Sequence, residues 1–212
     1  MMIESRRVFS SKKDMVYVSL RDAIVAGEIT AGERLIIDEL ARKFDVSHIP
    51  VREALQMLGS EGFVVFRPHA GATVTEVSED AIAEVFDLLE ALEIVSSAAA
   101  CNNTTPEEVE RLRTIVKGMD DLVDQPEAWS EQNHLFHLEL CKMAGYALTL
   151  QLQERVKSHW DRIRRRFLLS AFTHHIKQAQ SEHWDMIKAL ENGDSGQLTE
   201  IIRRHNRTAR EA

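Results

Sequence analysis

The chain has 212 residues and a formal net charge of −8, with 44% hydrophobic and 28% charged residues. That apolar fraction can bury a core, which excludes a disordered or collagen-like chain. No apolar run is long enough to span a membrane, and the first residues do not predict a signal peptide. Two cysteines cannot form a disulfide framework. We therefore expect a cytoplasmic protein without a membrane partner.

The residue spacing predicts a mostly α protein. Apolar residues recur at intervals of three and four, except over residues 63–77, where Phe63–Arg67 and Ala72–Val77 flank a Pro-His-Ala-Gly turn. This exception predicts a β-hairpin. Ser78 can cap a following helix, so we expect one domain over residues 1–77 and an antiparallel all-α bundle over residues 78–212.

A winged helix-turn-helix is predicted for the first domain. The expected order is a helix over Asp14–Ala26, a short helix over Glu39–Phe44, a turn over Asp45–Ser47, a helix over His48–Ser60 and then the hairpin. Residues 1–77 carry ten basic and eleven acidic residues, against sixteen and twenty-three in the remainder. Bulk charge does not decide whether the domain binds DNA, because affinity depends on local basic faces.

The second helix of this motif normally enters the major groove of DNA with its first residues at the base edges. The exposed early residues here are expected to be Ser47, His48, Ile49 and Arg52. Arg52 can contact guanine through two hydrogen bonds. The alternative is an ordinary surface ion pair with Glu53 or Glu61.

Histidines interrupt three predicted apolar helix faces in the second domain. Asn133 and His137 are one helical turn apart. His183 and His205 lie eleven residues before and after Asp194, in a predicted turn between antiparallel helices, so they should face each other. Three imidazoles and one oxygen suit a divalent Zn²⁺, Ni²⁺ or Mn²⁺ ion. The alternative is core histidines bonded to backbone carbonyls.

An effector pocket needs a polar anchor as well. A predicted helix over Leu148–Ser170 has an apolar face that includes Leu148 and Leu152; His159 falls inside this face and Arg166 at its edge. We expect Arg166 to anchor a carboxylate, with His159 and Ser170 nearby. Alternatively, residues 162–166 form a solvated run of charge.

The first domain resembles the N-terminal domain of GntR-family transcriptional regulators. The resemblance rests on Pro-Val-Arg-Glu-Ala-Leu at 50–55, Glu-Gly at 61–62 and a late glycine at 71. It implies DNA contacts by Ser47, Arg52, His69 and Gly71. Asp38 and His48 stand where members that contact DNA usually carry arginine.

The second domain resembles the FCD domain of the FadR subfamily, a helical bundle. The similar segments are LLEALEIVSSAAA, Asn-x-x-Phe-His at 133–137, Glu-His at 182–183, Ala-Leu-Glu-Asn-Gly-Asp at 189–194 and His205. In metal-binding members an Asp and three His hold the ion beneath a small-molecule pocket. The implied ligands here are Asn133, at the Asp position, with His137, His183 and His205. Leu89 stands where many members have arginine.

Together these features predict a ligand-responsive repressor, not an enzyme, that binds a near-palindromic DNA operator as a homodimer. A small organic acid would bind a pocket that contains the metal. One alternative is a three-His metal-dependent hydrolase, although HLFHLEL is not the H-E-x-x-H motif of such enzymes. A second is a metal-sensing regulator in which the ion itself is the effector.

Overall fold

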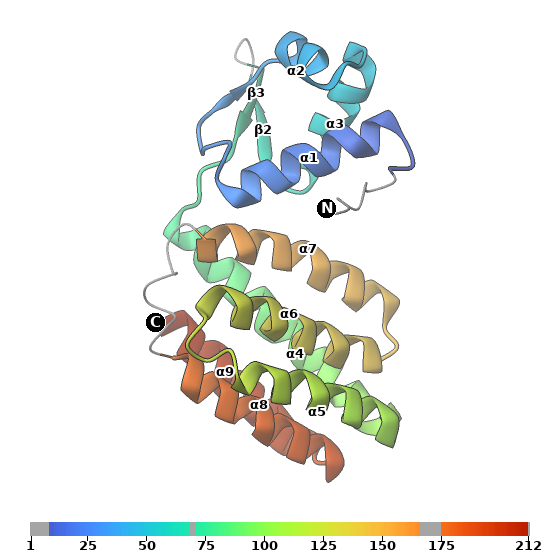
Figure 1. Cartoon of the computed structure of the whole chain (residues 1–212), viewed down its shortest axis with the longest axis vertical. Coiled ribbons are helices and arrows are strands. Elements are labelled where there is room, and N and C mark those ends of the chain that lie inside the picture. The colour runs from blue at the N-terminus through green and yellow to red at the C-terminus, as the bar shows by residue number, and fades with distance from the viewer. Residues whose placement is uncertain (1–8, 68–70, 166–174, 212) are drawn as a thin grey trace, which may run out of the picture. The chain divides into compact units, whose positions relative to one another are not determined.

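A computed structural model describes residues 9–67, 71–165 and 175–211 of the chain. The chain divides between Val77 and Ser78 into two compact units (Figure 1). Each unit has its own hydrophobic core. Within the described residues, no helix combines the length and apolar character that a membrane crossing requires. The fold is predominantly helical, as the spacing of apolar residues predicted.

The N-terminal unit is a winged helix-turn-helix. Its elements are α1 (Lys12–Ala26), β1 (Arg34–Leu35), α2 (Ile37–Phe44), α3 (His48–Ser60), β2 (Val64–Arg67) and β3 (Gly71–Val74). Ser11 begins α1 by accepting a hydrogen bond from the Asp14 amide, and Gly27 ends it at φ +80°. The buried side of α3, made of Val51, Ala54, Leu55 and Leu58, belongs to the apolar core of this unit.

Two local features of this unit differ from the sequence prediction. The sheet has the antiparallel order β1-β3-β2, and the two-residue strand β1 was not predicted. Helix α2 begins at Ile37, two residues before the predicted start at Glu39. Helix α3 begins at His48, as predicted, with Ser47 at its N-cap position, although the Ser47 side chain makes no capping hydrogen bond.

The C-terminal unit is a bundle of helices: α4 (Glu79–Asn103), α5 (Pro106–Asp120), α6 (Pro126–Met143), α7 (Ala147–Ile163), α8 (Ile176–Glu191) and α9 (Ser195–Glu211). The Ser78 hydroxyl accepts a hydrogen bond from the Ala81 amide and begins α4. Helix α4 packs against α6, α7 and α9, so it contacts several of the helices that surround the histidines.

Helices α8 and α9 form the predicted hairpin and lie side by side (Figure 1). Gly193 takes φ +63° in the turn, a conformation that glycine adopts without strain. The Asp194 carboxylate then accepts a hydrogen bond from the Gln197 amide in the first turn of α9. This tight connection sets His183 and His205 at the same height.

Candidate metal centre and nucleic-acid interface

Three imidazoles converge inside the C-terminal bundle. His137 comes from α6, His183 from α8 and His205 from α9, and each offers a ring nitrogen within 4.8 Å of the other two. Their ring centroids are 4.9–5.3 Å apart. All three side chains are buried. The close approach expected from the three helix faces is therefore present.

His183 is the most informative of the three. Its side chain is fully buried, and neither Nδ1 nor Nε2 has a hydrogen-bond partner in the described part of the chain. Burial, followed by the charges of His205 and His137, holds the pKa of His183 well below its ordinary value, so the ring is neutral near pH 7. Leaving a buried polar group unpaired costs about 1–3 kcal/mol. A core histidine bonded to a carbonyl does not describe this ring, whose two nitrogens remain available to a ligand.

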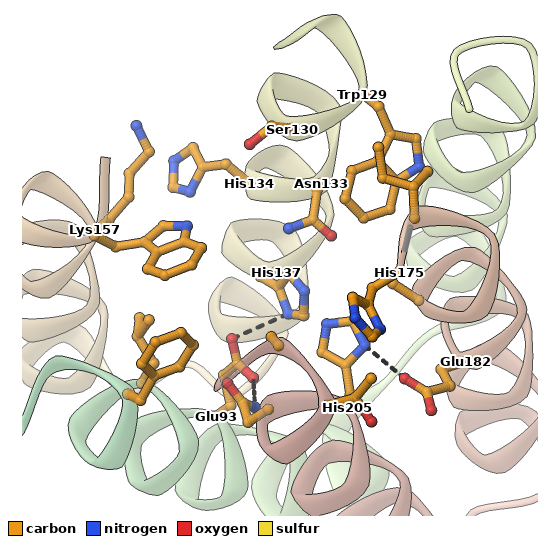
Figure 2. A pocket seen from close by; sticks show the side chains of 18 of the residues that line it. Glu93, Trp129, Ser130, Asn133, His134, His137, Lys157, His175, Glu182 and His205 are labelled. Carbon is orange, nitrogen blue, oxygen red and sulfur yellow. Dashed lines mark hydrogen bonds and ion pairs between the residues drawn. The ribbon is translucent and has the colours of Figure 1, made fainter. Parts of the chain in front are cut away.

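The other two imidazoles each use Nδ1 to face a carboxylate (Figure 2). His137 Nδ1 lies 3.1 Å from Glu93 Oε1, at an angle less favourable than that of a regular hydrogen bond. His205 Nδ1 lies 3.0 Å from Glu182 Oε2. When Nδ1 carries the proton that faces the carboxylate, the nitrogen left for a ligand is Nε2 in both rings.

Both carboxylates are buried, and their pKa values are shifted downward. Burial alone would raise the pKa of Glu93, but interactions with His137, Asn206 and His205 outweigh it and lower the pKa. Burial also opposes the shift at Glu182, where the hydrogen bond and charge of His205 lower the pKa. Both groups are therefore ionised at neutral pH.

Asn133 lies one turn before His137 and borders the same pocket. Its Oδ1 atom is buried without a hydrogen-bond partner among the described residues. A neutral amide oxygen and three imidazole nitrogens form a donor set that Zn²⁺, Ni²⁺ and Mn²⁺ accept. The residues present therefore fit a divalent transition metal.

An open pocket adjoins these residues. His137, His205 and Asn133 border it, whereas the fully buried His183 does not. The aromatic residues Phe86, Trp129 and Trp160 line it together with Leu89 and the polar residues Ser130, His134, Lys157 and Asp161.

One wall of the pocket is polar (Figure 2). The Lys157 ammonium donates to Asp161 Oδ2 at 2.6 Å. Burial lowers the pKa of His134 to about 3, with smaller contributions from the positive charges of Lys157 and His137. This wall therefore presents a paired cation and a neutral imidazole.

The prediction of the pocket-facing side of α7 was wrong. Leu148 and Leu152, which defined that side, are 69% and 40% exposed, and Gln153 and Lys157 line the pocket instead. His159 is half-buried and is not among the lining residues. Arg166 and Ser170 lie outside the described residues. In the sequence, the i, i+4 spacing of Gln153 and Lys157 indicates that both side chains lie on the same face of the helix, and this was the available signal for the pocket-lining side.

The residues predicted to read DNA gather at the start of α3. Ser47, His48, Ile49 and Arg52 are all exposed, and Ile49 is an apolar side chain that is 67% exposed. Within the described part of the chain no carboxylate forms an ion pair with Arg52, so its guanidinium is available to another partner. This arrangement suits a surface that contacts a nucleic acid.

Asp38 and His48, the two residues that replace arginine, lie next to each other. His48 Nε2 is 3.2 Å from Asp38 Oδ1. In the wing, Gly71 begins β3 at φ +79°, beside the exposed Arg34, which sequence reasoning missed. His69 lies outside the described residues. A cation beside the wing can contact the phosphate backbone.

A winged helix-turn-helix followed by a helical bundle that holds a pocket is the architecture of a DNA-binding regulator. Comparison with known protein families identifies the family of regulators to which the chain belongs. Residues 12–74 match the model "Bacterial regulatory proteins, gntR family", and residues 84–208 match the FCD domain. The chain belongs to the GntR family of transcriptional regulators, in the FadR-like group that carries an FCD domain, and is not an enzyme.

Curated relatives agree with this assignment. An uncharacterized HTH-type transcriptional regulator of Streptomyces ambofaciens is 30% identical over 91% of this chain and 80% of its own length. The HTH-type transcriptional repressor RspR of Escherichia coli is 25% identical over 90% and 83%. A gluconate operon transcriptional repressor of Bacillus licheniformis is 29% identical over 67% and 59%.

Among solved structures, E. coli McbR/YncC has a TM-score of 0.74 at 22% identity, covering 95% of this chain and 96% of its own. A GntR regulator from Rhodococcus has a TM-score of 0.72 at 20% identity, covering 95% and 97%. At these identities the likeness establishes the shared fold.

Proposed function

We propose that the protein is a repressor that binds a near-palindromic operator as a homodimer and releases it when a small organic acid binds the metal-containing pocket. The observation that carries this proposal is the fully buried His183, whose two ring nitrogens have no hydrogen-bond partner among the described residues and lie among two further imidazoles, beside an open pocket. Repression as the sign of control is supported by the two relatives named repressors.

On the DNA side, we assign base-edge contacts to Ser47, His48, Ile49 and Arg52, and backbone contacts to the wing residues His69 and Gly71. The exposure of the α3 residues supports the first group. In a symmetric dimer the two reading helices would lie roughly 34–36 Å apart, one turn of DNA. A DNA-binding regulator acts where the chromosome is, so we propose a cytoplasmic location.

Inside the bundle, we assign His137, His183, His205 and Asn133 as ligands of a divalent Zn²⁺, Ni²⁺ or Mn²⁺ ion. When bound, such an ion supplies a Lewis acid that can take a carboxylate oxygen of the effector. The two carboxylate–imidazole contacts hold the rings of His137 and His205 in one tautomer.

The other end of the effector would meet the polar wall. Lys157 can donate a hydrogen bond while paired with Asp161, and Ser130 and neutral His134 can donate or accept. Trp160 supplies an apolar ring beside them. Arg166 and Ser170 remain predicted anchors in the segment that follows the described part of α7, whereas His159 does not line the described pocket.

The proposal can be tested on a duplex selected from random sequences by the purified protein. We expect one acid from a panel of mono- and dicarboxylates to weaken binding of the metal-loaded protein about 5–150-fold, the usual range of allosteric coupling. The chelator-treated protein should not respond to the acid. Equal responses with and without metal would contradict a metal-dependent pocket.

The same titration separates the metal-sensing alternative. If the ion alone changes operator affinity in a graded way and no acid adds to it, the ion is the effector. The polar lining beyond the histidines favours an organic effector, since an ion alone does not need it. The hydrolase alternative is excluded by the family assignment.

A further inference from the structure

The two carboxylates that face the candidate ligand rings have different surroundings. Glu93 and Glu182 are 5% and 4% exposed, and each lies about one hydrogen-bond length from an Nδ1 atom, at His137 and His205 respectively. They hold similar positions relative to the cluster. What differs is how the negative charge of each is compensated.

Glu182 has a fixed cation beside it. Arg204 Nε donates to Glu182 Oε1 at 3.1 Å, and Gln178 Nε2 donates to the same oxygen at 3.2 Å. The guanidinium stays charged whether or not a metal is bound. The charge of Glu182 is therefore compensated inside the protein itself.

Glu93 has no such partner in the described part of the chain. Its other contacts are two neutral amides: Asn206 Nδ2 at 2.8 Å from Oε2, and Gln153 Nε2 at 3.5 Å from Oε1. A buried carboxylate is costly unless positive charge lies nearby. The contact through which such charge can reach Glu93 is His137.

The candidate ligand set lacks negative charge, whereas Glu93 lacks a nearby positive charge. His137, His183 and His205 are neutral as ligands, and the amide of Asn133 is neutral too, so a dication would bring two uncompensated positive charges into a buried site. Asn133 occupies the position where a carboxylate would supply negative charge directly. A buried anion one imidazole away from the ion can supply it instead.

We propose that Glu93 is the charge-compensating positioning residue of the metal centre: acting through His137, it supplies the negative charge that Asn133 does not and directs Nε2 of His137 toward the ion. Glu182 orients His205 in the same way, but Arg204 already balances its charge. This inference rests on the proposed metal site.

The test compares two isosteric substitutions in the full-length protein. After treatment with a chelator, Zn²⁺ affinity is measured by competition with a chromophoric chelator. Glu93→Gln should weaken Zn²⁺ binding toward the upper end of the roughly 10–100-fold range seen when an outer-shell partner is lost. Glu182→Gln, the matched control, should weaken it toward the lower end.

A charge rescue separates compensation from simple support of the fold. Asn133→Asp should tighten Zn²⁺ binding more in the Glu93→Gln background than in the unchanged protein, because it then restores the missing negative charge. Thermal unfolding without metal and the visible absorption of the Co²⁺-loaded protein report whether each variant keeps its fold and coordination geometry. We expect Glu93→Gln to keep both at saturating Co²⁺.

One kind of result would contradict the role of Glu93 alone, and another would contradict the metal site as well. The role of Glu93 would be overturned if Glu93→Gln and Glu182→Gln lowered Zn²⁺ affinity equally. It would also be overturned if Asn133→Asp raised Zn²⁺ affinity by the same factor whether residue 93 is Glu or Gln. Either result would leave the metal site itself intact. If the unchanged protein takes up neither Zn²⁺ nor Co²⁺, the metal centre itself is wrong, and the role of Glu93 falls with it.

Discussion

The two units bury different kinds of residue. In the described N-terminal unit the buried side chains are apolar, from Val16 in α1 to Val74 in β3. In the C-terminal unit the buried set also includes polar and charged side chains: Glu93, Ser96, Ser97, His137, Gln153, Arg162, Arg164, Gln180, Glu182, His183, His205 and Asn206. This contrast in buried residues is expected if the N-terminal unit binds DNA at its surface and the C-terminal unit binds a small ligand in its interior.

A unit that reads DNA needs a rigid apolar core and a polar surface, since its partner stays outside. A unit that encloses a small ligand must hold polar groups inside, where each needs an internal partner or a ligand. A substitution at the binding site of one unit should therefore leave the binding residues of the other unit in place, provided that the change does not unfold the chain. The four predictions below test that separation.

The largest effect is expected from His183→Ala combined with His205→Ala. This double variant loses two of three imidazole donors and should purify with almost no bound metal, measured by elemental analysis. His48→Ala, in the N-terminal unit, is the control and should keep the metal content of the unchanged protein. A full equivalent of metal in the double variant would contradict the ligand assignment.

The next largest effect is expected from Arg52→Ala, on operator binding. A bidentate contact to a base discriminates by about 1–3 kcal/mol, and the proposed dimer would make two such contacts, so specific affinity for the selected duplex should fall roughly 30-fold or more. Helical content and metal content should not change. Gln56→Ala, exposed further along α3, serves as the control. An unaltered footprint with Arg52→Ala would refute the contact.

A smaller effect, of opposite sign, is expected from Asn133→Asp. A carboxylate in place of the amide adds negative charge to the ligand set, so Zn²⁺ affinity should rise about tenfold, the change that 1.4 kcal/mol produces. Competition with a chelator measures it, while operator binding of the metal-loaded protein serves as the cross-check. Equal or weaker affinity would argue against Asn133 as a ligand.

The last prediction concerns pH and the metal-free protein. The folded pKa values of His183 and His134 are both lowered, the second to about 3. The unfolded chain therefore takes up protons that the folded chain refuses below about pH 6.5. Stability should be greatest above that pH and fall as the pH decreases toward 5, with a slope of at most about 1.4 kcal/mol per pH unit for each histidine.

Urea unfolding in the presence of a chelator measures this slope. His134→Gln should reduce it, because one of the two groups no longer titrates. His48→Gln changes an exposed ring in the other unit and should not change the slope of stability against pH. A slope that does not respond to His134→Gln would mean that this ring is protonated as easily in the folded chain as in the unfolded one.

Local patterns predicted several elements well and others poorly, for physical reasons. Helix α3 has the predicted bounds, because its apolar face agrees with the local start and stop residues. Strand β1 was missed, since its two residues form a strand only by pairing with β3. On α7 the apolar residues Leu148 and Leu152 turned out to face outward. The side of α7 that borders the pocket carries Gln153 and Lys157 instead.

By itself the sequence determined the two-unit plan and the meeting of His183 with His205, because a short turn between antiparallel helices sets their relative height through backbone geometry alone. Only the tertiary structure decided that Glu93 faces His137 and Asn206, the second of which is 113 residues away. It also decided that Lys157 lines the pocket. Such contacts depend on how α4 and α7 are rotated and shifted against their neighbours, which core packing decides and no local spacing encodes.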